Sequence, residues 1–131
     1  MTNIKIHKCY PKNPVLKKII KLFWIIRSYD EKIIHVKLIP TNNIDLIINN
    51  TNTIEYKTSK KEESFANTHF SGIQNHYRFI EQKGPLDIVG ISFHPAGLYP
   101  LVKIPVIEFR NHITSIDSII PGIETKIERV A

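Results

Sequence analysis

The clearest pattern of hydrophobic and polar positions lies at residues 84–109, which read GPLDIVGISFHPAGLYPLVKIPVIEF. The segment Leu86 to Phe93 is apolar and rich in β-branched side chains, and its alternation of period two predicts a strand. Pro95 then suits the first turn of a helix, where its missing N–H costs nothing. Pro100 and Pro105 restrict that helix to a short segment.

A second helix is predicted near the N-terminus. Asn13 followed by Pro14 is a typical helix start, and lysines occupy the face opposite the apolar residues. A helix lying on a membrane surface would show a similar pattern, but the stretch is short, which favours packing on the domain's own sheet. The apolar residues at helical spacing are Leu16, Ile19, Ile20 and Phe23.

Most of the remaining chain predicts strands. Residues 33–39 and 44–48 are separated by a predicted turn at 40–43, which indicates a hairpin. Residues 58–67 are charged and polar, which predicts a connecting loop. Cys9 is expected to lie in an N-terminal loop. Residues 124–131 contain helix-forming residues, which predicts the start of a helix. Many short strands with two or three short helices predict a mostly-β barrel or sandwich. The predicted strands are 24–29, 33–39, 44–48, 54–57, 69–73, 75–81 and 86–93.

Length and charge narrow the class of protein. At 131 residues the chain is expected to form a single domain, residues 1–131. The net charge of +6 would suit a nucleic-acid partner. However, the lysines are scattered and arginine, the usual base reader, is sparse. The abundance of Lys, Asn and Ile favours the composition bias of an AT-rich genome over a nucleic-acid surface.

Cysteine content and hydropathy bear on location. The only cysteine is Cys9, so no internal disulfide can form. No apolar run is long enough to span a bilayer, and the N-terminus lacks the apolar core of a signal peptide. These features predict a cytoplasmic protein without a membrane partner.

Sequence motifs for catalysis or cofactor binding are missing. None of the six histidines forms an H-x-H pair, and His69 and His76 are separated by Gly72, which is expected to break a strand. The chain contains no G-x-S-x-G elbow, P-loop or G-x-G-x-x-G motif. The sequence therefore predicts a protein that is not an enzyme and that holds no metal or other cofactor.

A binding pocket is a better-supported hypothesis, because small barrels can enclose one small molecule. Aromatic residues are candidates for its walls, and two polar residues share one face of the predicted strand 75–81. The alternative is that the aromatic residues fill the barrel core and the polar ones face solvent. The candidate ligand-binding residues are Trp24, His76, Tyr77, Arg78 and Phe93.

Several of these segments resemble the sensor domain found at the N-terminus of some AraC-type bacterial transcription regulators. Residues 90–97, GISFHPAG, match the family's G-[VI]-x-F-x-P-G-G, and I-P and E-F follow. Phe23-Trp24 matches an aromatic pair that ends the family's first helix, and residues 38–48, LIPTNNIDLII, match its strand-turn-strand. Ala96 departs from the first glycine of the motif, and Thr41-Asn42 replaces an Asp-Gly turn. The ordered matches run over roughly residues 11–117.

The resemblance implies a cupin-like jelly-roll barrel that binds a small-molecule effector or forms a homodimer. In that family, paired helix-turn-helix units C-terminal to the sensor domain bind DNA, and no such unit is visible in this chain. We therefore expect 1–131 to be the sensor or dimerisation domain, with DNA contacted only through a further domain. The alternatives are a stand-alone cupin-like protein, either ligand-binding or metal-dependent, and a small basic nucleic-acid-binding protein.

Overall fold

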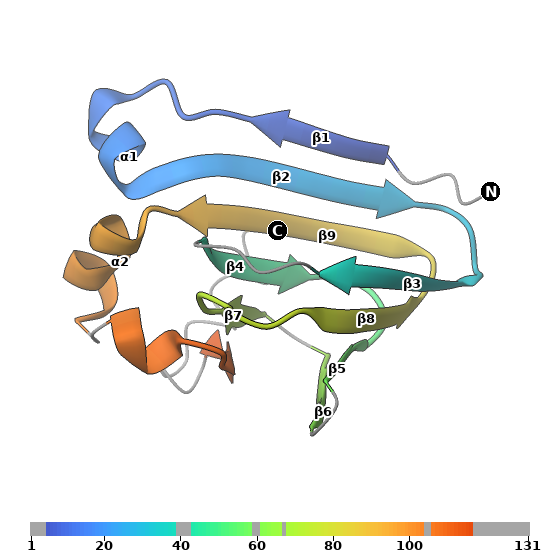
Figure 1. Cartoon of the computed structure of the whole chain (residues 1–131). Helices are drawn as coiled ribbons and strands as arrows, with labels where there is room; N and C mark the ends of the chain where they lie inside the picture. The colour runs from blue at the N-terminus through green and yellow to red at the C-terminus, as the bar shows by residue number, and fades with distance from the viewer. Residues whose placement is uncertain (1–4, 39–42, 59–60, 67, 104–105, 117–131) are drawn as a thin grey trace.

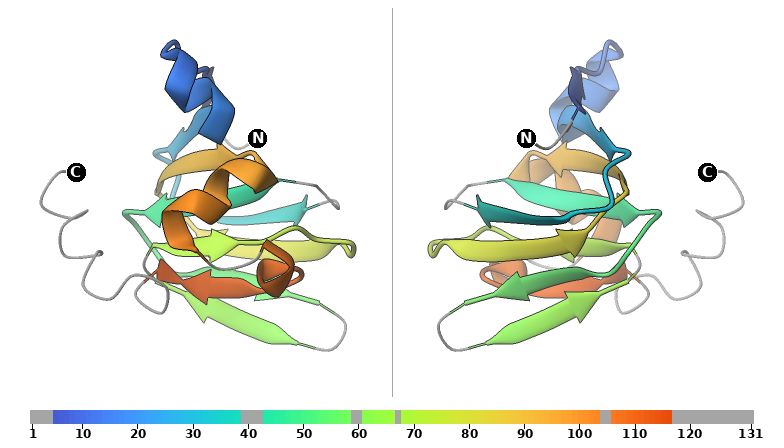
Figure 2. Two further views of the ribbon diagram at one scale, coloured as in Figure 1. Left: turned by 90° about the vertical axis from the view of Figure 1, so that its left-hand side faces the viewer. Right: turned by 90° about the vertical axis from the view of Figure 1, so that its right-hand side faces the viewer.

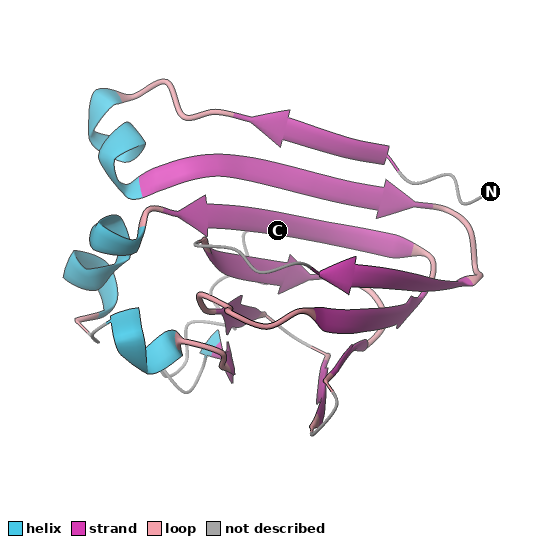
Figure 3. Cartoon of the chain, viewed as in Figure 1, coloured by secondary structure: helices cyan, strands magenta, loops and turns pink. Residues whose placement is uncertain are grey.

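The computed structural model describes residues 5–38, 43–58, 61–66, 68–103 and 106–116. Strands dominate this part of the chain, and its short helices gather at one end of the strands (Figures 1 and 3). The helices are α1 (Pro14–Ile19), α2 (Pro95–Val102) and the 3₁₀ helix η1 (Val106–Phe109). The strands are β1 (Lys5–Cys9), β2 (Ile20–Ser28), β3 (Ile33–Leu38), β4 (Ile44–Asn49), β5 (Ile54–Lys57), β6 (Glu62–Phe65), β7 (His69–Ser71), β8 (Arg78–Lys83), β9 (Leu86–Phe93) and β10 (Ile113–Ser115).

The strands form two antiparallel sheets that face each other (Figure 2). Sheet A has the order β1-β2-β9-β4-β7-β10, and sheet B has the order β3-β8-β5-β6. Neighbouring strands in both sheets are mostly distant in sequence, so the sheets are held together by long-range pairing. This arrangement is a β sandwich.

Nested pairing identifies the topology. Strand β2 pairs with β9, β3 with β8, β4 with β7 and β5 with β6, as in one long hairpin with its tip at β5–β6. Alternate pairs lie in opposite sheets, joined by β9–β4 in sheet A and β8–β5 in sheet B. A long hairpin wrapped in this way into two sheets is a jelly roll, the architecture of cupins. The predicted mostly-β, cupin-like class with two or three short helices is confirmed for the described residues.

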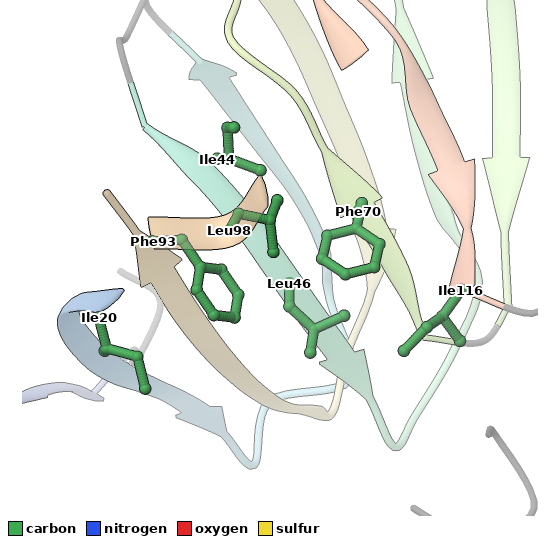
Figure 4. Close-up of a cluster of buried hydrophobic side chains, with 7 residues drawn as sticks. All are labelled: Ile20, Ile44, Leu46, Phe70, Phe93, Leu98 and Ile116. Carbon is green, nitrogen blue, oxygen red and sulfur yellow. The ribbon is translucent and has the colours of Figure 1, made fainter. Parts of the chain in front are cut away.

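The larger apolar cluster lies on the outer face of sheet A, under helix α2 (Figure 4). Leu98 of α2 is 1% exposed and packs in a cluster with side chains from four strands of this sheet, β2, β4, β7 and β9. Since side chains alternate along a strand, the same strands present their other residues to the interior between the sheets. The buried members of the outer cluster are Ile20, Ile44, Leu46, Phe70, Phe93, Leu98 and Ile116.

A second cluster lies between the two sheets. It joins Ile47 and Ile88 of sheet A to Ile54 and Tyr56 of sheet B, with Ile113 of β10. Trp24 packs against this cluster from β2 and lies opposite Gly90 of β9. A Cβ atom at position 90 would lie 1.8 Å from Cε2 of Trp24, so the indole occupies the space that only glycine leaves free.

The turn from β9 into α2 matches the sequence prediction. Pro95 is the first residue of α2, and Pro100 lies within the helix. The backbone N–H of His94 donates to the carbonyl of Ile19, at 2.9 Å. A Cβ at Gly97 would lie 2.6 Å from the Cα of Ile19. The glycine retained in the motif therefore permits the close approach of α2 to the end of α1.

The predicted first helix is shorter than expected. The side chain of Asn13 caps α1, accepting a bond from the Val15 N–H at 2.8 Å, but the helix ends at Ile19. Ile20 and Phe23 instead belong to β2, which pairs with β9. Leu16 remains 41% exposed. β-branched residues in this segment favour a strand once a pairing partner is available, and that partner lies far along the chain.

The predicted hairpin between residues 33–39 and 44–48 is wrong. Strand β3 lies in sheet B beside β8, whereas β4 lies in sheet A between β9 and β7. The sequence also missed β1, β6 and β10, three short strands at sheet edges. Cys9 therefore lies in β1 rather than in a loop, and it is exposed. The helix proposed at 124–131 and most of the turn at 40–43 lie outside the described residues.

Candidate functional site

A cavity of about 770 Å³ lies beside the β5–β6 hairpin and the start of β8. This volume is in the range of small-molecule sites, which enclose roughly 300–1,000 Å³. Its walls come from sheet B, from the segment that leads into β8, and from the turn before β10. The lining residues are Tyr56, Thr58, Lys61, Glu63, Asn75, His76, Tyr77, Arg78, Phe79 and Asn111.

Arg78 is the most buried charged residue that lines this cavity, at 6% exposure. It begins β8, where Ile80 and Gln82 alternate inward with it while Phe79 is 50% exposed. Its Nη2 donates to the backbone carbonyl of Asn111. Burial lowers the pKa of Arg78, while Glu63 and Tyr56 oppose that shift. The guanidinium is a cation held largely out of water, which is costly unless it is paired.

Asn111 fixes the segment that carries Arg78. It adopts a left-handed backbone conformation, with φ 58°, which asparagine tolerates better than most residues. Its side-chain Oδ1 accepts from the backbone N–H of Asn75 at 3.0 Å, and its own N–H donates to the carbonyl of Ile73 at 2.7 Å. These bonds join the turn before β10 to the segment before β8. They hold the Asn111 carbonyl where Arg78 can reach it.

The wall formed by Tyr56 is both apolar and hydrogen-bonded. The Tyr56 hydroxyl lies 2.6 Å from Nε2 of His69, which is fully buried. The ring of His69 stacks on Phe65, with centroids 4.8 Å apart. Burial is the main cause of the raised pKa of Tyr56, so the phenol stays neutral at physiological pH. This hydrogen bond links Tyr56, which lines the cavity, to the buried His69.

The charges around the cavity do not cancel. Glu63 is the one carboxylate among the lining residues, and Lys61 approaches it at 2.7 Å. Within the described residues, no carboxylate forms an ion pair with Arg78. With Arg78 and Lys61 positive and Glu63 negative, the lining carries one excess positive charge when histidine is neutral.

Three of the five residues predicted to bind a ligand come together at this cavity: His76, Tyr77 and Arg78. Tyr77 is 54% exposed and contacts Phe79 edge to face, with centroids 5.7 Å apart. Neither aromatic ring is part of the core, so the core-filling alternative does not describe them.

The other two predicted residues lie elsewhere. Phe93 is buried in the cluster beneath α2. Trp24 faces the interior, where its Nε1 donates to Oγ of Ser92 at 3.2 Å. Ser92 in turn donates to Oδ1 of Asp45 at 2.5 Å. Neither Trp24 nor Phe93 lines the cavity.

Sequence reasoning missed several residues of the site. Tyr56 lies in a predicted strand and could have been found from the alternation of residues 54–57. Lys61 and Glu63 were assigned to a polar connection, because the strand β6 is too short and charged to give a strand signal. No sequence pattern marked Asn111, because it lies 33 residues from Arg78 in the sequence and only the fold brings the two together.

Two further properties bear on the class of site. Within the described ranges, no group of three or more His, Cys, Asp or Glu residues is arranged to hold a metal ion. In the same part of the chain, no helix combines the length and the apolar character needed to cross a membrane. The lining residues themselves give the cavity hydrogen-bonding and cationic side chains.

Comparison with known proteins places this jelly-roll domain in a family. Residues 8–115 match the model of the family described as "Domain of unknown function (DUF6597)", and the chain belongs to that family. No curated protein sequence matches the chain. Among solved structures, it is similar to the cupin domain of an XRE-family transcriptional regulator from Enterobacter cloacae, with 11% identity and a TM-score of 0.42. That match covers 70% of this chain and 97% of the other.

Proposed function

We propose that this domain is an effector-sensing domain of an AraC-type transcription regulator, which binds a small molecule in the cavity beside β8. The observation that carries the proposal is the cavity itself, about 770 Å³ and lined by the buried guanidinium of Arg78. Burying a cation at a cavity wall lowers the stability of the folded protein. Such a residue is typical of a site that receives a ligand.

The regulatory role is supported by the ordered sequence motifs that resemble AraC-type sensor domains. Effector binding in the cavity would alter how the domain contacts a second copy or an attached DNA-binding domain. The segments around the cavity suit such coupling, because Asn111 joins the turn before β10 to the segment before β8. On this proposal the protein acts in the cytoplasm and contacts DNA only through a separate domain.

Ligand binding is tested by filling the cavity. Asn75 lines it with an exposed side chain, and only its backbone N–H is bonded to Asn111. Asn75→Trp should therefore occupy the cavity without disturbing the core. Val15→Trp, on the exposed face of α1, is the matched control. In a thermal-shift screen of metabolites, compounds that stabilise the wild-type chain should also stabilise the control and should fail with Asn75→Trp. Stabilisation that is unaffected by Asn75→Trp would contradict binding in this cavity.

The assignment of DNA binding to another domain has its own test. Residues 1–131 are expected to give no sequence-selective shift in a gel-mobility assay with fragments of the adjacent promoter region. Weak binding that falls steeply with salt would reflect the net charge of +6 only. A shift that distinguishes one promoter sequence from its scrambled counterpart would overturn this part of the proposal.

A further inference from the structure

We propose that the cavity beside β8 selects an organic carboxylate, which Arg78 binds through two parallel hydrogen bonds. This inference rests on the proposed ligand-binding function and adds the chemical class of the ligand. It starts from the hydrogen-bonding capacity of Arg78. A guanidinium has five N–H donors and no acceptor, and the described contacts of Arg78 engage Nη2 with the Asn111 carbonyl.

The neighbouring groups offset the charge of Arg78 only in part, because each is bonded to another residue. Glu63 forms its ion pair with Lys61, at 2.7 Å. The Tyr56 hydroxyl is bonded to His69, and burial raises its pKa, so it supplies no negative charge. Arg78 is 6% exposed, so water has little access to screen its charge. An anion that enters the cavity could therefore form an ion pair with Arg78, which no carboxylate among the described residues forms.

The charge of the site favours a carboxylate over a phosphate. A carboxylate carries one negative charge and matches the planar fork of a guanidinium with two parallel bonds. The lining has one excess positive charge, which a carboxylate balances. A phosphate monoester carries about −1.5 to −2 at pH 7, and it would remain only partly neutralised here.

The other walls indicate the body of the ligand. Tyr56, Tyr77 and Phe79 line the cavity, and Tyr77 and Phe79 contact each other edge to face. Such aromatic walls suit an aromatic or aliphatic group attached to the carboxylate, with Asn75 and Thr58 as polar contacts. The expected ligands are thus hydrophobic organic acids with a single carboxylate.

The experiment compares acids with their neutral isosteres on the full chain. The probes are benzoate, phenylacetate and octanoate, their primary amides, and inorganic phosphate, each measured by calorimetry up to millimolar concentration. The variants are Arg78→Lys, which keeps a cation and a donor for the Asn111 carbonyl, Asn75→Trp, and the surface control Val15→Trp. Circular dichroism checks that each variant is folded. In parallel, the Nε–H resonance of Arg78 is followed by NMR in the wild-type chain, which needs no folded variant.

At least one acid should bind the wild-type chain and Val15→Trp roughly 10- to 100-fold more tightly than its amide, as expected for a charge-assisted bidentate contact. Asn75→Trp should abolish binding, and Arg78→Lys should reduce the preference for the acid to about threefold or less. The Arg78 Nε–H resonance should shift with the acid and not with the amide.

Other outcomes separate the two proposals. Equal binding of acids and amides that Asn75→Trp still abolishes would overturn the carboxylate assignment and leave the ligand-binding function standing. Phosphate binding in preference to every acid, or acid binding that leaves the Arg78 resonance unmoved, would also overturn it. If no probe binds, charged or neutral, the carboxylate assignment is contradicted, whereas ligand binding in the cavity is decided by the metabolite screen with Asn75→Trp.

Discussion

The two faces of sheet A are built from the same strands but differ in polarity, because the inner face mixes apolar residues such as Ile47 and Ile88 with polar ones. On the outer face, Phe93, Leu46 and Phe70 pack under α2 in an apolar cluster. On the inner face, the neighbouring positions include Asp45, Ser92 and His69. Each apolar outer residue is adjacent in sequence to one of these polar inner residues, because side chains alternate along a strand.

The difference shows how a small jelly roll can hold polar groups and a cavity in its interior. In a two-layer sandwich the space between the sheets usually carries most of the core. Here α2 provides a second apolar layer on the outer face of sheet A, with Leu98 only 1% exposed. Because part of the buried apolar surface lies in this outer layer, the space between the sheets can accommodate Arg78 and Asp45.

The largest expected effect comes from breaking the outer cluster. Phe93→Ala should lower the free energy of unfolding by about 3–5 kcal/mol, because it removes a buried aromatic ring and leaves a cavity. The control is the same substitution at Phe79, which is 50% exposed and should cost about 1 kcal/mol or less. Urea unfolding followed by circular dichroism measures both. A loss at Phe93 no larger than at Phe79 would show that the outer face is not the main core.

An intermediate effect is expected where the interior is most tightly packed. Gly90→Ala should cost about 1–3 kcal/mol, because the new methyl group would lie 1.8 Å from the indole of Trp24. Trp24 is the only tryptophan, so its fluorescence reports the displacement directly. In a Trp24→Leu background, followed by circular dichroism, the same substitution should cost much less. An equal cost in both backgrounds would mean that Trp24 is not the obstacle.

The smallest effect concerns the polar interior and depends on pH. Burial raises the pKa of Asp45 in the folded protein, although bonds from Ser92 and the nearby Lys21 oppose it. The stability that this group contributes is therefore full below the ordinary aspartate pKa and is lost as the pH rises through the folded-state pKa. Asp45→Asn cannot ionise, so the stability of the wild-type chain relative to this variant should fall as pH rises.

Urea unfolding of both proteins across a pH series from about 4 to 7 measures this difference. The same substitution at Asp87, whose side chain is exposed beside Arg27, controls for the change in net charge. A difference between wild type and Asp45→Asn that does not change with pH would contradict a raised pKa at Asp45.

Local sequence signals predicted β9 and the turn into α2 well. The strand has a clear alternation, and Pro95 restricts the backbone directly. Ile20 and Phe23 were misassigned to the first helix because their spacing also fits a helix, and only pairing with β9 selects the strand. The site was predicted in part for the same reason. Residues 76–78 are contiguous and carried a signal, whereas Asn111 reaches Arg78 only through the fold.

By itself, the sequence determined the mostly-β class, the strand and turn that lead into α2, and the contiguous residues 76–78 that line the cavity. These follow from local periodicity and from the backbone restrictions of proline and asparagine. The tertiary structure decided which strands pair, which face of sheet A is covered by α2, and which side chains meet at the cavity. Those choices depend on contacts between segments far apart in the chain, such as β2 with β9 and Arg78 with Asn111. Local patterns carry no information about such contacts, because each strand could pair with several partners at similar local cost.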